Sequence, residues 1–414
     1  MNSSATLPTK DELAPATQEE LAERVREAFA AGTPLYPAGG RTKHGLGLPA
    51  KAPGSVLSLK KLARIIDYPA RDMTITVEAG LTMKALADVL AKERQRLPID
   101  VPLSHLATIG GVIATNTNGP RRFGEGTIRD YVIGIHAVDG RGMPFKGGGR
   151  VVKNVAGYDF CKLLTGSLGT LAVITQVTLR LKPIPEQLAL VACSVPDLES
   201  AETLLHNLIA SRVAPTAIEL LAGPGWESEP ALESLARAGQ HSLFLVVGLE
   251  GTGPEVEFMV SQLIAEWREQ DVADPLLVGE SAALWDRLVE FPAPGDAPLV
   301  LQASVAPSGI TALVNAARRL DPGCTIQAHA GNGSATLKFS EFPQQGLSRA
   351  LVGNLQPVAS AHHGHVRVLS NPGGAEMTHQ SVWGATDAPL WLMGEVKRKF
   401  DPKDILNRGR FLFS

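Results

Sequence analysis

Cysteine is scarce in this chain of 414 residues, which contains only Cys161, Cys193 and Cys324. No two of them form a C-x-x-C pair, so a zinc ribbon, an iron–sulfur cluster and a disulfide framework are not expected. So few cysteines suit a reducing compartment, and we expect a cytoplasmic protein.

Long apolar runs are also missing. No run reaches the roughly 18 apolar residues that a transmembrane helix needs. The first residues are polar and lack the apolar core of a secretory signal, so we expect membrane attachment only through a partner, if at all. The net charge of −3 argues against broad electrostatic capture of nucleic acid.

What is present is the composition of a globular protein with a large core. Hydrophobic residues make up 44% of the chain and charged residues 20%. A chain of this length is expected to form two or three domains. The strand pattern of 172–181 ends at Pro183 and Pro185, which predicts a boundary there and a first domain over 1–185.

Local patterns place the regular elements. Thr17 and Glu20 predict the start of a helix that Gly32 ends, and glycine turns follow the short strand pattern at 34–36. The segments 131–138 and 143–145 read as a hairpin around Asp139 and Gly140. After residue 188, strand and helix patterns alternate in a way that fits an antiparallel sheet with helices on one face.

Glycine is abundant, with 41 residues, and it is dense in two regions. The first follows the strand at 34–36 and reads Pro37-Ala38-Gly39-Gly40-Arg41-Thr42-Lys43. Consecutive glycines let backbone N–H groups converge on an anion, while the hydroxyl and the two cations add donors and charge. This suits a pyrophosphate; a plain surface loop is the alternative.

The second region contains two further segments. Thr108-Ile109-Gly110-Gly111-Val112-Ile113-Ala114-Thr115-Asn116-Thr117-Asn118-Gly119 would allow close approach to a flat ligand, or would form a glycine-rich bend between strands. The runs 153–159 (KNVAGYD) and 166–175 (GSLGTLAVIT) lead through a tight turn into a strand whose backbone could bond a ligand edge.

Other nucleotide and catalytic motifs fail. Gly45-x-Gly47-x-x-Ala50 resembles the Rossmann fingerprint, but Pro49 and Pro53 stand where the helix should begin. No G-x-x-x-x-G-K-[ST] run and no G-x-S-x-G elbow occurs.

Taken in this order, the three glycine-rich segments resemble the PCMH-type FAD domain of the vanillyl-alcohol-oxidase superfamily. The run from GYD to GTLAVIT is most similar to the branch that holds bacterial glycolate oxidase subunits and D-lactate dehydrogenases. The similarity covers 35–183 and returns at 400–407, where FDP is followed by LN. It implies an α+β protein: a two-subdomain FAD-binding fold over 1–185, a cap domain with an antiparallel sheet over 186–395, and a tail over 396–414 that returns to the flavin.

The resemblance also implies where FAD is held. Residues 38–43 would wrap the pyrophosphate, 108–111 and 115–119 would line the flavin and diphosphate, and 169–174 would approach the adenine and the isoalloxazine edge. The implied cofactor contacts are Ala38, Gly39, Gly40, Arg41, Thr42, Lys43, Thr108, Ile109, Gly110, Gly111, Thr115, Asn116, Asn118, Gly119, Thr127, Asp130, Lys153, Asp159, Gly169, Thr170, Ile174 and Asn407.

Some members of the superfamily bind flavin covalently through a histidine of the first loop. Here Arg41 and Thr42 occupy that stretch and His44 comes later, so non-covalent FAD is expected. Lys153 would offer positive charge near the ring and would steady the reduced flavin anion.

The sequence departs from the family where oxidising members carry a metal in the cap domain. Their pattern is His-x-Gly-Asp-Gly-Asn-x-His with a later Glu-His-Gly. Here His329-Ala330-Gly331-Asn332-Gly333-Ser334-Ala335-Thr336 keeps the first histidine alone, so no metal is expected. His362, His363 and His365 could replace it or could form an exposed strand start. His329 is either a hairpin residue or a catalytic base. His329 and Lys153 are the two catalytic candidates that the sequence offers.

Three functions remain open. The resemblance favours an FAD subunit of a glycolate oxidase (dehydrogenase) complex, which oxidises glycolate to glyoxylate and passes electrons to an iron–sulfur subunit and quinone. Its partners would be that subunit and a larger homologous flavoprotein, at the inner face of the cell membrane. The alternatives are a stand-alone FAD-dependent 2-hydroxy-acid dehydrogenase of the D-lactate type and a non-catalytic assembly subunit that retains the fold.

Overall fold

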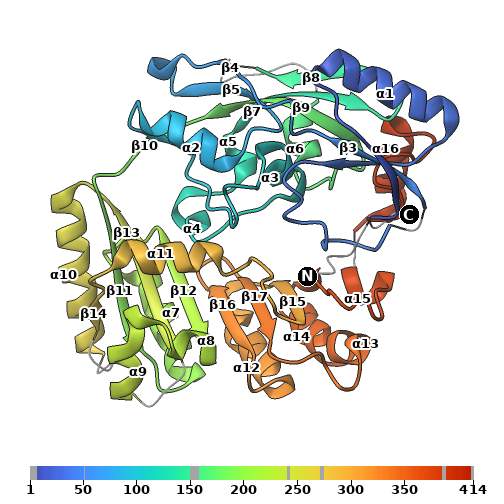
Figure 1. Ribbon diagram of the computed structural model, residues 1–414. Coiled ribbons are helices and arrows are strands. Elements are labelled where there is room, and N and C mark those ends of the chain that lie inside the picture. The colour runs from blue at the N-terminus through green and yellow to red at the C-terminus, as the bar shows by residue number, and fades with distance from the viewer. Residues whose placement is uncertain are drawn as a thin grey trace. The chain divides into compact units, whose positions relative to one another are not determined.

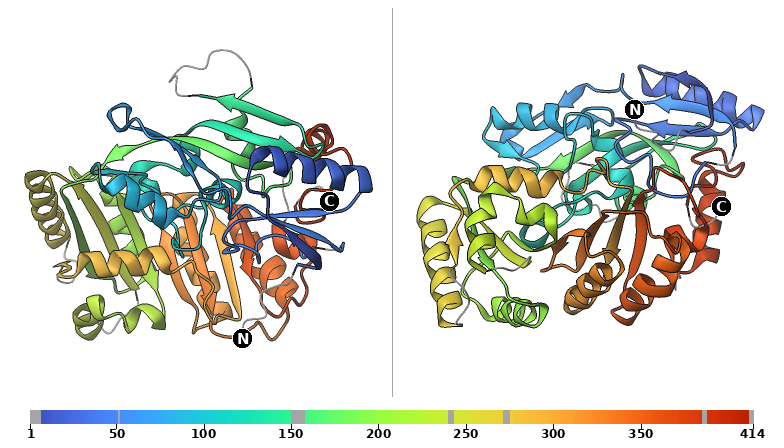
Figure 2. Two further views of the ribbon diagram at one scale, coloured as in Figure 1. Left: turned by 45° about the horizontal axis from the view of Figure 1, so that its top comes forward. Right: turned by 60° about the horizontal axis from the view of Figure 1, so that its bottom comes forward.

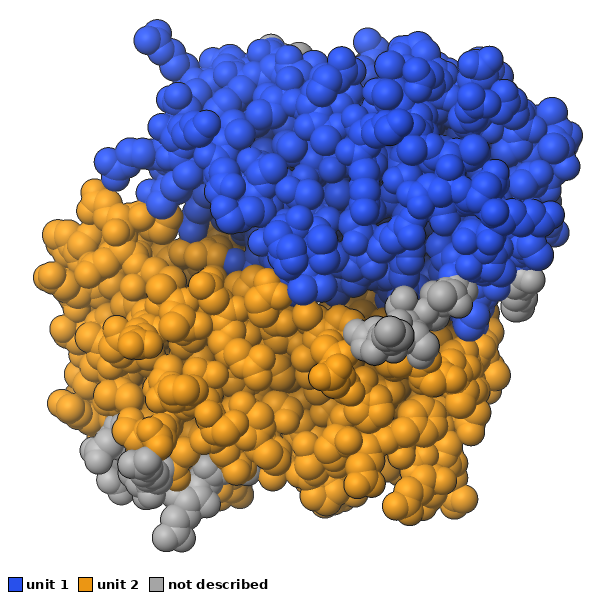
Figure 3. Space-filling model, in the orientation of Figure 1, with its two compact units in different colours: residues 1–118, 127–184, 387–414 blue, residues 119–126, 185–386 orange. Residues whose placement is uncertain are grey.

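The computed structural model describes residues 7–50, 52–149, 158–239, 243–270, 275–384 and 388–411. The chain divides into two compact units (Figure 3). Unit 1 comprises Met1–Asn118, Thr127–Ile184 and Asp387–Ser414, and unit 2 comprises Gly119–Gly126 and Pro185–Thr386. The C-terminal segment of unit 1 thus starts before residue 396, and a short piece of the N-terminal half belongs to unit 2. The functional domain limits at 185 and 395 stay predictions.

Unit 1 contains most of the N-terminal half and the last helix (Figures 1 and 2). Its elements are β1 (Thr9–Leu13), α1 (Gln18–Ala31), β2 (Leu35–Ala38), β3 (Gly54–Ser58), β4 (Ile65–Asp67), a 3₁₀ turn (Ala70–Asp72), β5 (Thr74–Glu78), α2 (Met83–Ala91), β6 (Gln95–Arg96), α3 (Ile109–Thr115), α5 (Ile128–Tyr131), β7 (Val132–Asp139), β8 (Pro144–Gly148), α6 (Phe160–Leu164), β9 (Ala172–Arg180), β10 (Lys182–Pro183) and α16 (Leu390–Phe400).

Three sheets organise unit 1. A parallel sheet has the strand order β1-β3-β2, an antiparallel sheet has the order β4-β5-β9-β7-β8, and β10 pairs with β6. The first helix begins and ends as its sequence predicts. The Thr17 side chain accepts a hydrogen bond from the Glu20 amide at 3.2 Å, and Gly32 ends the helix with a left-handed φ of 67°.

The C-terminal segment is fixed against β2, where Leu35 and Leu406 form a parallel β-bridge. The Leu35 amide donates to the Ile405 carbonyl at 2.7 Å, and the Asn407 amide donates to the Leu35 carbonyl at 2.9 Å. The buried ammonium group of Lys397 holds the same segment, because it lies 2.7 Å from Asp401 Oδ2 and donates to the Leu406 carbonyl at 3.1 Å. The tail therefore returns to the N-terminal strands over a wide sequence separation.

Unit 2 is built around one large sheet. Its elements are α4 (Arg122–Glu125), β11 (Gln187–Ser194), α7 (Leu198–Ala210), β12 (Ala217–Ala222), α8 (Pro224–Glu227), a 3₁₀ turn (Pro230–Leu232), α9 (Glu233–Gly239), β13 (Leu243–Gly251), α10 (Gly253–Glu269), β14 (Leu276–Leu277), α11 (Ser281–Glu290), β15 (Leu299–Ser304), a 3₁₀ turn (Pro307–Gly309), α12 (Ile310–Leu320), β16 (Thr325–His329), β17 (Ser334–Phe339), α13 (Leu347–Ala350), a π-helical turn (Leu351–Leu355), α14 (Gln356–Ala361), β18 (His365–Ser370) and α15 (His379–Trp383).

The eight strands pair antiparallel in the order β14-β11-β13-β12-β16-β17-β15-β18, as the sequence predicts for its second half. One face packs against α7, α10, α12 and α14 and forms the largest core (Figures 1 and 2). The expectation that helices cover one face only is wrong. Trp226 of α8, Leu235 of α9 and Trp285 of α11 pack on the other face, over the strands around β11 and β13.

Two further features concern the whole chain. None of the described helices is long and apolar enough to cross a membrane. Cys161, Cys193 and Cys324 are all buried and free. Burial raises the pKa of the Cys161 thiol to about 11 and that of Cys193 to about 12, which keeps both in the unreactive thiol form near neutral pH.

Candidate cofactor site

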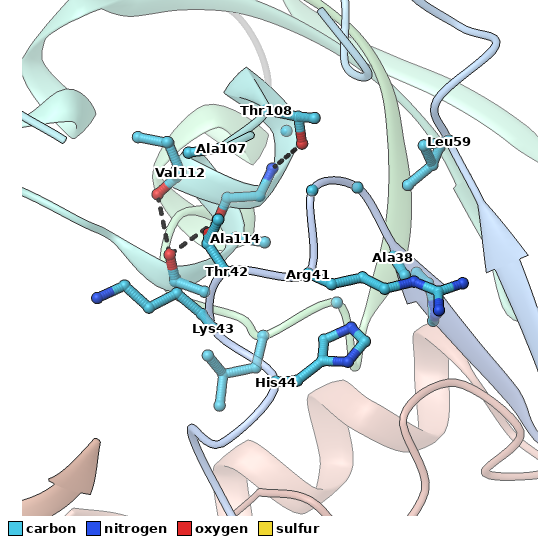
Figure 4. A pocket seen from close by; sticks show the side chains of 18 of the residues that line it. Ala38, Arg41, Thr42, Lys43, His44, Leu59, Ala107, Thr108, Val112 and Ala114 are labelled. Atoms are coloured by element: carbon cyan, nitrogen blue, oxygen red, sulfur yellow. Dashed lines mark hydrogen bonds between the residues drawn. The ribbon is translucent and has the colours of Figure 1, made fainter. Parts of the chain in front are cut away.

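A cleft in unit 1 brings the glycine-rich segments together (Figure 4). It holds about 990 Å³ of space, part of it open to solvent, which is the size range of a ligand pocket. Four segments contribute most of the lining: the loop after β2, α3 with the residues just before it, the turn that leads into β9 with the start of that strand, and the C-terminal tail. The lining is Leu7, Pro37, Ala38, Gly39, Gly40, Arg41, Thr42, Lys43, His44, Leu46, Leu59, Val101, Ala107, Thr108, Gly110, Gly111, Val112, Ala114, Thr115, Thr117, Leu168, Gly169, Ala172, Val173, Ile174, Asn407 and Arg410.

The glycines of the first loop are required by the protein's own backbone. A Cβ atom on Gly40 would lie 1.7 Å from the Leu106 carbonyl oxygen, and one on Gly39 would lie 2.0 Å from Thr108 Oγ1. Only glycine lets this loop pack so tightly against the segment before α3. The close packing places the loop beside the first turn of α3, on one wall of the cleft.

Gly111 differs from these two glycines. A Cβ atom there would meet only Thr108 Oγ1, at 3.3 Å, and Gly111 lines the cleft. Its amide donates to Thr108 Oγ1, the N-cap of α3, at 3.4 Å (Figure 4). The absence of a side chain at Gly111 therefore leaves space in the cleft for a ligand, and is not needed for packing within the protein. This is expected where a cofactor lies directly against the backbone.

The turn before β9 is held by the tail. Gly169 has a left-handed φ of 66°, which disfavours any other residue. The Asn407 side-chain amide donates to the Leu168 carbonyl at 2.6 Å. A tail asparagine thus fixes a turn that lies more than two hundred residues earlier in the chain.

Arg410 is the functional residue that sequence reasoning missed. Its side chain lies in the cleft lining, the residue is only 8% exposed, and Nη2 donates to the carbonyls of His44 at 2.6 Å and Leu46 at 2.7 Å. Among the described residues it forms no ion pair with a carboxylate. Burial holds its pKa below the usual value. A buried guanidinium without a counter-ion suits an anionic ligand such as a diphosphate.

The other cations of the first loop differ in their surroundings. Arg41 forms an ion pair with Glu12 at 2.7 Å, and both side chains are largely exposed. His44 lines the cleft, and burial, assisted by the charges of Arg410 and Arg41, lowers its pKa to about 4. The imidazole is therefore neutral near pH 7 and leaves the positive charge to the arginines and Lys43.

The structure brings together many, though not all, of the residues predicted to contact a cofactor. Those that line the cleft are Ala38, Gly39, Gly40, Arg41, Thr42, Lys43, Thr108, Gly110, Gly111, Thr115, Gly169, Ile174 and Asn407. Those that do not are Ile109, Asn116, Asn118, Gly119, Thr127, Asp130, Asp159 and Thr170. Lys153 lies outside the described residues.

Several of the second group have structural roles. Thr127 and Asp130 form the capping box of α5, and the Asp159 side chain caps α6. Ile109 is fully buried in the core beneath α3. The predicted contacts of these residues with the cofactor stay predictions. Short polar side chains such as threonine and aspartate also cap helices, so their presence alone does not distinguish the two roles.

The histidine candidates lie in unit 2. His329 Nδ1 is 2.7 Å from Glu219 Oε1 on the neighbouring strand, and both side chains are buried. His363 has a left-handed φ of 56° just before β18. In the part of the chain that the structure describes, no group of three or more His, Cys, Asp or Glu residues could hold a metal ion.

The unit 1 cleft has the properties of a dinucleotide cofactor site: small residues on the walls, glycine where backbone must come close, and a buried unpaired cation. Two family models match the chain, the FAD binding domain over residues 12–147 and the C-terminal domain of FAD linked oxidases over residues 184–411. The second match alone spans more than half of the chain, which therefore belongs to the FAD-linked oxidases. Its cofactor is FAD, and it is an oxidoreductase.

Curated relatives match over different lengths. The D-lactate dehydrogenase of Archaeoglobus fulgidus is 28% identical over 96% of this chain and 90% of its own length. The mitochondrial D-lactate dehydrogenase [cytochrome] of Arabidopsis thaliana is 27% identical over 96% of this chain and 72% of its own. Glycolate oxidase subunit GlcE of Escherichia coli is 35% identical, over 40% of this chain and 47% of its own length.

Solved structures confirm the fold. p-Cresol methylhydroxylase has a TM-score of 0.73 at 16% identity, over 96% of this chain and 88% of that chain. An alkyldihydroxyacetonephosphate synthase has a TM-score of 0.72 at 18% identity, and the match covers 97% of this chain and 77% of that chain. The chain has the α+β fold of the PCMH-type, vanillyl-alcohol-oxidase class, as its glycine-rich segments predict.

Proposed function

We propose that this chain oxidises a small 2-hydroxy acid to the 2-oxo acid with FAD held non-covalently in the unit 1 cleft. The observation that carries the proposal is the cleft itself, with its small-residue walls and the buried, unpaired Arg410. Relatives that match almost the whole chain are named for D-lactate, which is a 2-hydroxy acid. A shorter match is named D-2-hydroxyglutarate dehydrogenase, from Xanthomonas citri.

Bound FAD would supply the two-electron oxidant: the carbinol hydride would pass to the flavin and the hydroxyl proton to a base, which turns the 2-hydroxy acid into a 2-oxo acid. The chain's own residues bind and orient the cofactor. Backbone amides of 38–43 and the Arg410 guanidinium would hold the diphosphate, and Gly111 and Gly169 would let the flavin approach the wall. Lys153 is kept as the proposed cation near the ring.

The test is the flavin content and reducibility of the purified chain. We expect a yellow protein whose visible flavin band bleaches anaerobically with glycolate, D-lactate or D-2-hydroxyglutarate. Acid precipitation should release the flavin into the supernatant, even though His44 lines the cleft. Flavin that stays with the precipitate would refute the non-covalent part, and a colourless chain that takes up no FAD would refute the whole proposal.

The finer proposal is a subunit of a glycolate oxidase complex of the GlcE kind, with a larger homologous flavoprotein and an iron–sulfur subunit as partners. The identity of 35% to GlcE over the matched part supports it. The complex would lie in the cytoplasm, peripheral to the membrane. Co-purification of both partners with the tagged chain is the expected result, and isolation of a fully active single chain would contradict it.

A stand-alone D-lactate-type dehydrogenase is the second candidate. The coverage of 96% of this chain by two D-lactate dehydrogenases favours it. Steady-state reduction of an artificial electron acceptor by D-lactate, with the isolated chain alone, would select this candidate. A non-catalytic assembly role predicts flavin-free protein or a flavin that no acid reduces.

A further inference from the structure

The segment around β1 reaches the cofactor cleft of unit 1, far in sequence from the glycine-rich walls. Leu7 lies in the cleft lining. The Thr9 amide donates to the Leu7 carbonyl at 2.8 Å, so a three-residue turn centred on Pro8 joins the cleft to the first residue of β1. The match to the FAD binding domain begins only at residue 12. The residues from Leu7 to the middle of β1 are thus a part of the cleft region that this match does not include.

The strand β1 is held loosely. Four of its five side chains are exposed, and Leu13 at its end is partly buried. Among the described strands it pairs only with β3, from Thr9 opposite Gly54 to Leu13 opposite Leu57, and the register shifts between Thr9 and Asp11. An edge strand with few buried side chains separates from its sheet at a low cost in free energy.

The other walls of the cleft are fixed by close packing. A Cβ atom on Gly40 would lie 1.7 Å from the Leu106 carbonyl oxygen, so the first loop has no room to shift toward α3. Ile109 and Ile113 anchor α3, because both side chains are fully buried. The buried ammonium group of Lys397 holds the C-terminal tail. Compared with these walls, β1 is the part of the cleft region that opens most easily.

Glu12 connects the loose strand to the first loop. Its Oε2 accepts a hydrogen bond from Arg41 Nη2 at 2.7 Å, and this bond is the main cause that lowers the pKa of Glu12. Arg41 lines the cleft, in a left-handed backbone conformation with φ of 60°. A guanidinium has five N–H donors, so Arg41 can bond to Glu12 and to an anionic ligand together.

We propose that residues 7–13 form a clasp over the diphosphate of bound FAD. Leu7 covers the cleft on that side, and Arg41 would donate to the diphosphate while it stays bonded to Glu12. The cofactor then holds the strand in place and the strand holds the cofactor, so that release of FAD requires β1 to separate from β3. The inference deepens the proposed function, since it rests on non-covalent FAD in the unit 1 cleft.

A reversible lock tests the clasp in the full chain. Asp11→Cys combined with Ser55→Cys places two thiols at paired positions of β1 and β3, where a disulfide can form, while the three native cysteines are buried. The protein is loaded with FAD, oxidised and diluted, and free flavin is measured in filtered samples over time. Oxidation should slow FAD release roughly 10-fold or more, because it blocks local opening of the strand. Reduction of the same sample should restore the parent rate.

Two single substitutions test the clasp without a disulfide. Glu12→Gln should raise the rate of FAD release roughly 2- to 5-fold, the range expected when an exposed ion pair is lost. Leu7→Ala should raise the rate as well, although it keeps the ion pair. The matched control is Glu27→Gln, which breaks an exposed ion pair with Arg24 on α1, at 2.8 Å, and should leave the release rate unchanged.

Several results would overturn the inference. One is an equal rate of FAD release from the oxidised and the reduced lock, once thiol titration has shown that the disulfide is formed. If the disulfide does not form, release rates of Glu12→Gln and Leu7→Ala equal to that of the parent refute the clasp by themselves. A lower unfolding temperature of the FAD-free variants with unchanged release rates would assign β1 to packing of the sheet alone.

The same measurements separate the clasp from the proposed function. If the parent takes up no FAD, the proposed function fails and the clasp fails with it. If FAD binds and 2-hydroxy acids bleach it, while the lock and the single substitutions leave its release unchanged, the function stands and only the clasp fails. If the lock retains FAD but no 2-hydroxy acid bleaches it, the clasp stands and the proposed oxidation fails.

Discussion

Substitution of Gly111 by alanine should move flavin affinity and apoprotein stability in opposite directions. Gly111 lies in the first turn of α3, where glycine is less favourable than alanine by at most about 1 kcal/mol. A Cβ atom there meets only the flexible end of Thr108, at 3.3 Å. The apoprotein should therefore keep or slightly raise its free energy of unfolding.

The same methyl group would occupy ligand space. Crowding a packed interface by one methyl group costs about 1–3 kcal/mol, which corresponds to a loss of FAD affinity of roughly 5- to 150-fold. Leucine at this position should reduce flavin retention further. The measurements are FAD titration of the deflavinated protein, the flavin-to-protein absorbance ratio after purification, and urea unfolding of the apoprotein.

A matched control is Gly394→Ala in α16, where a Cβ atom would meet no other atom within 4 Å. It should give the same gain in helix stability without any change in FAD affinity. Gly40 is a poorer probe, since its Cβ would strike the Leu106 carbonyl oxygen at 1.7 Å and disturb the loop itself. An FAD affinity of Gly111→Leu equal to that of the parent would refute the placement of the cofactor against α3.

Substitutions at three further positions test the tail and the first loop. Arg410→Met should weaken FAD binding roughly 10- to 100-fold, with partial recovery in Arg410→Lys, because a buried charge next to the ligand is lost; an unchanged affinity in the titration would remove Arg410 from the site. Lys397→Met should lower the free energy of unfolding by about 3–5 kcal/mol in urea titration, because it leaves the fully buried Asp401 carboxylate without its partner; a loss below 1 kcal/mol would contradict this. His44 has a folded pKa of about 4 against 6.5 for the free side chain, so the unfolded chain binds more protons and apoprotein stability should fall as the pH drops from 6.5 to 4, by at most about 3 kcal/mol. His44→Gln should flatten that part of the stability curve, and an unaltered curve would show that other groups cause it.

The ends of helices could be predicted from the sequence because capping interactions involve residues that are only a few positions apart. The Thr17 cap and the Gly32 stop bound α1 as their residue types predict. Some local patterns were ambiguous for the same reason. Residues 109–115 form a helix rather than a bend between strands, because Thr108 caps it and its apolar side chains fill the core.

The amino-acid sequence by itself determined which segments could approach a dinucleotide, since glycine at 39, 40, 110 and 111 leaves backbone without side chains wherever the chain goes. It also determined that the histidine pattern of the family's metal site is incomplete. Only the tertiary structure decided which charges meet. Arg410 bonds to the His44 carbonyl across 366 positions, and Glu219 pairs with His329 across 110. Such pairs depend on strand register and on the return of the tail, which are set by packing of the whole core and leave no mark in a local pattern.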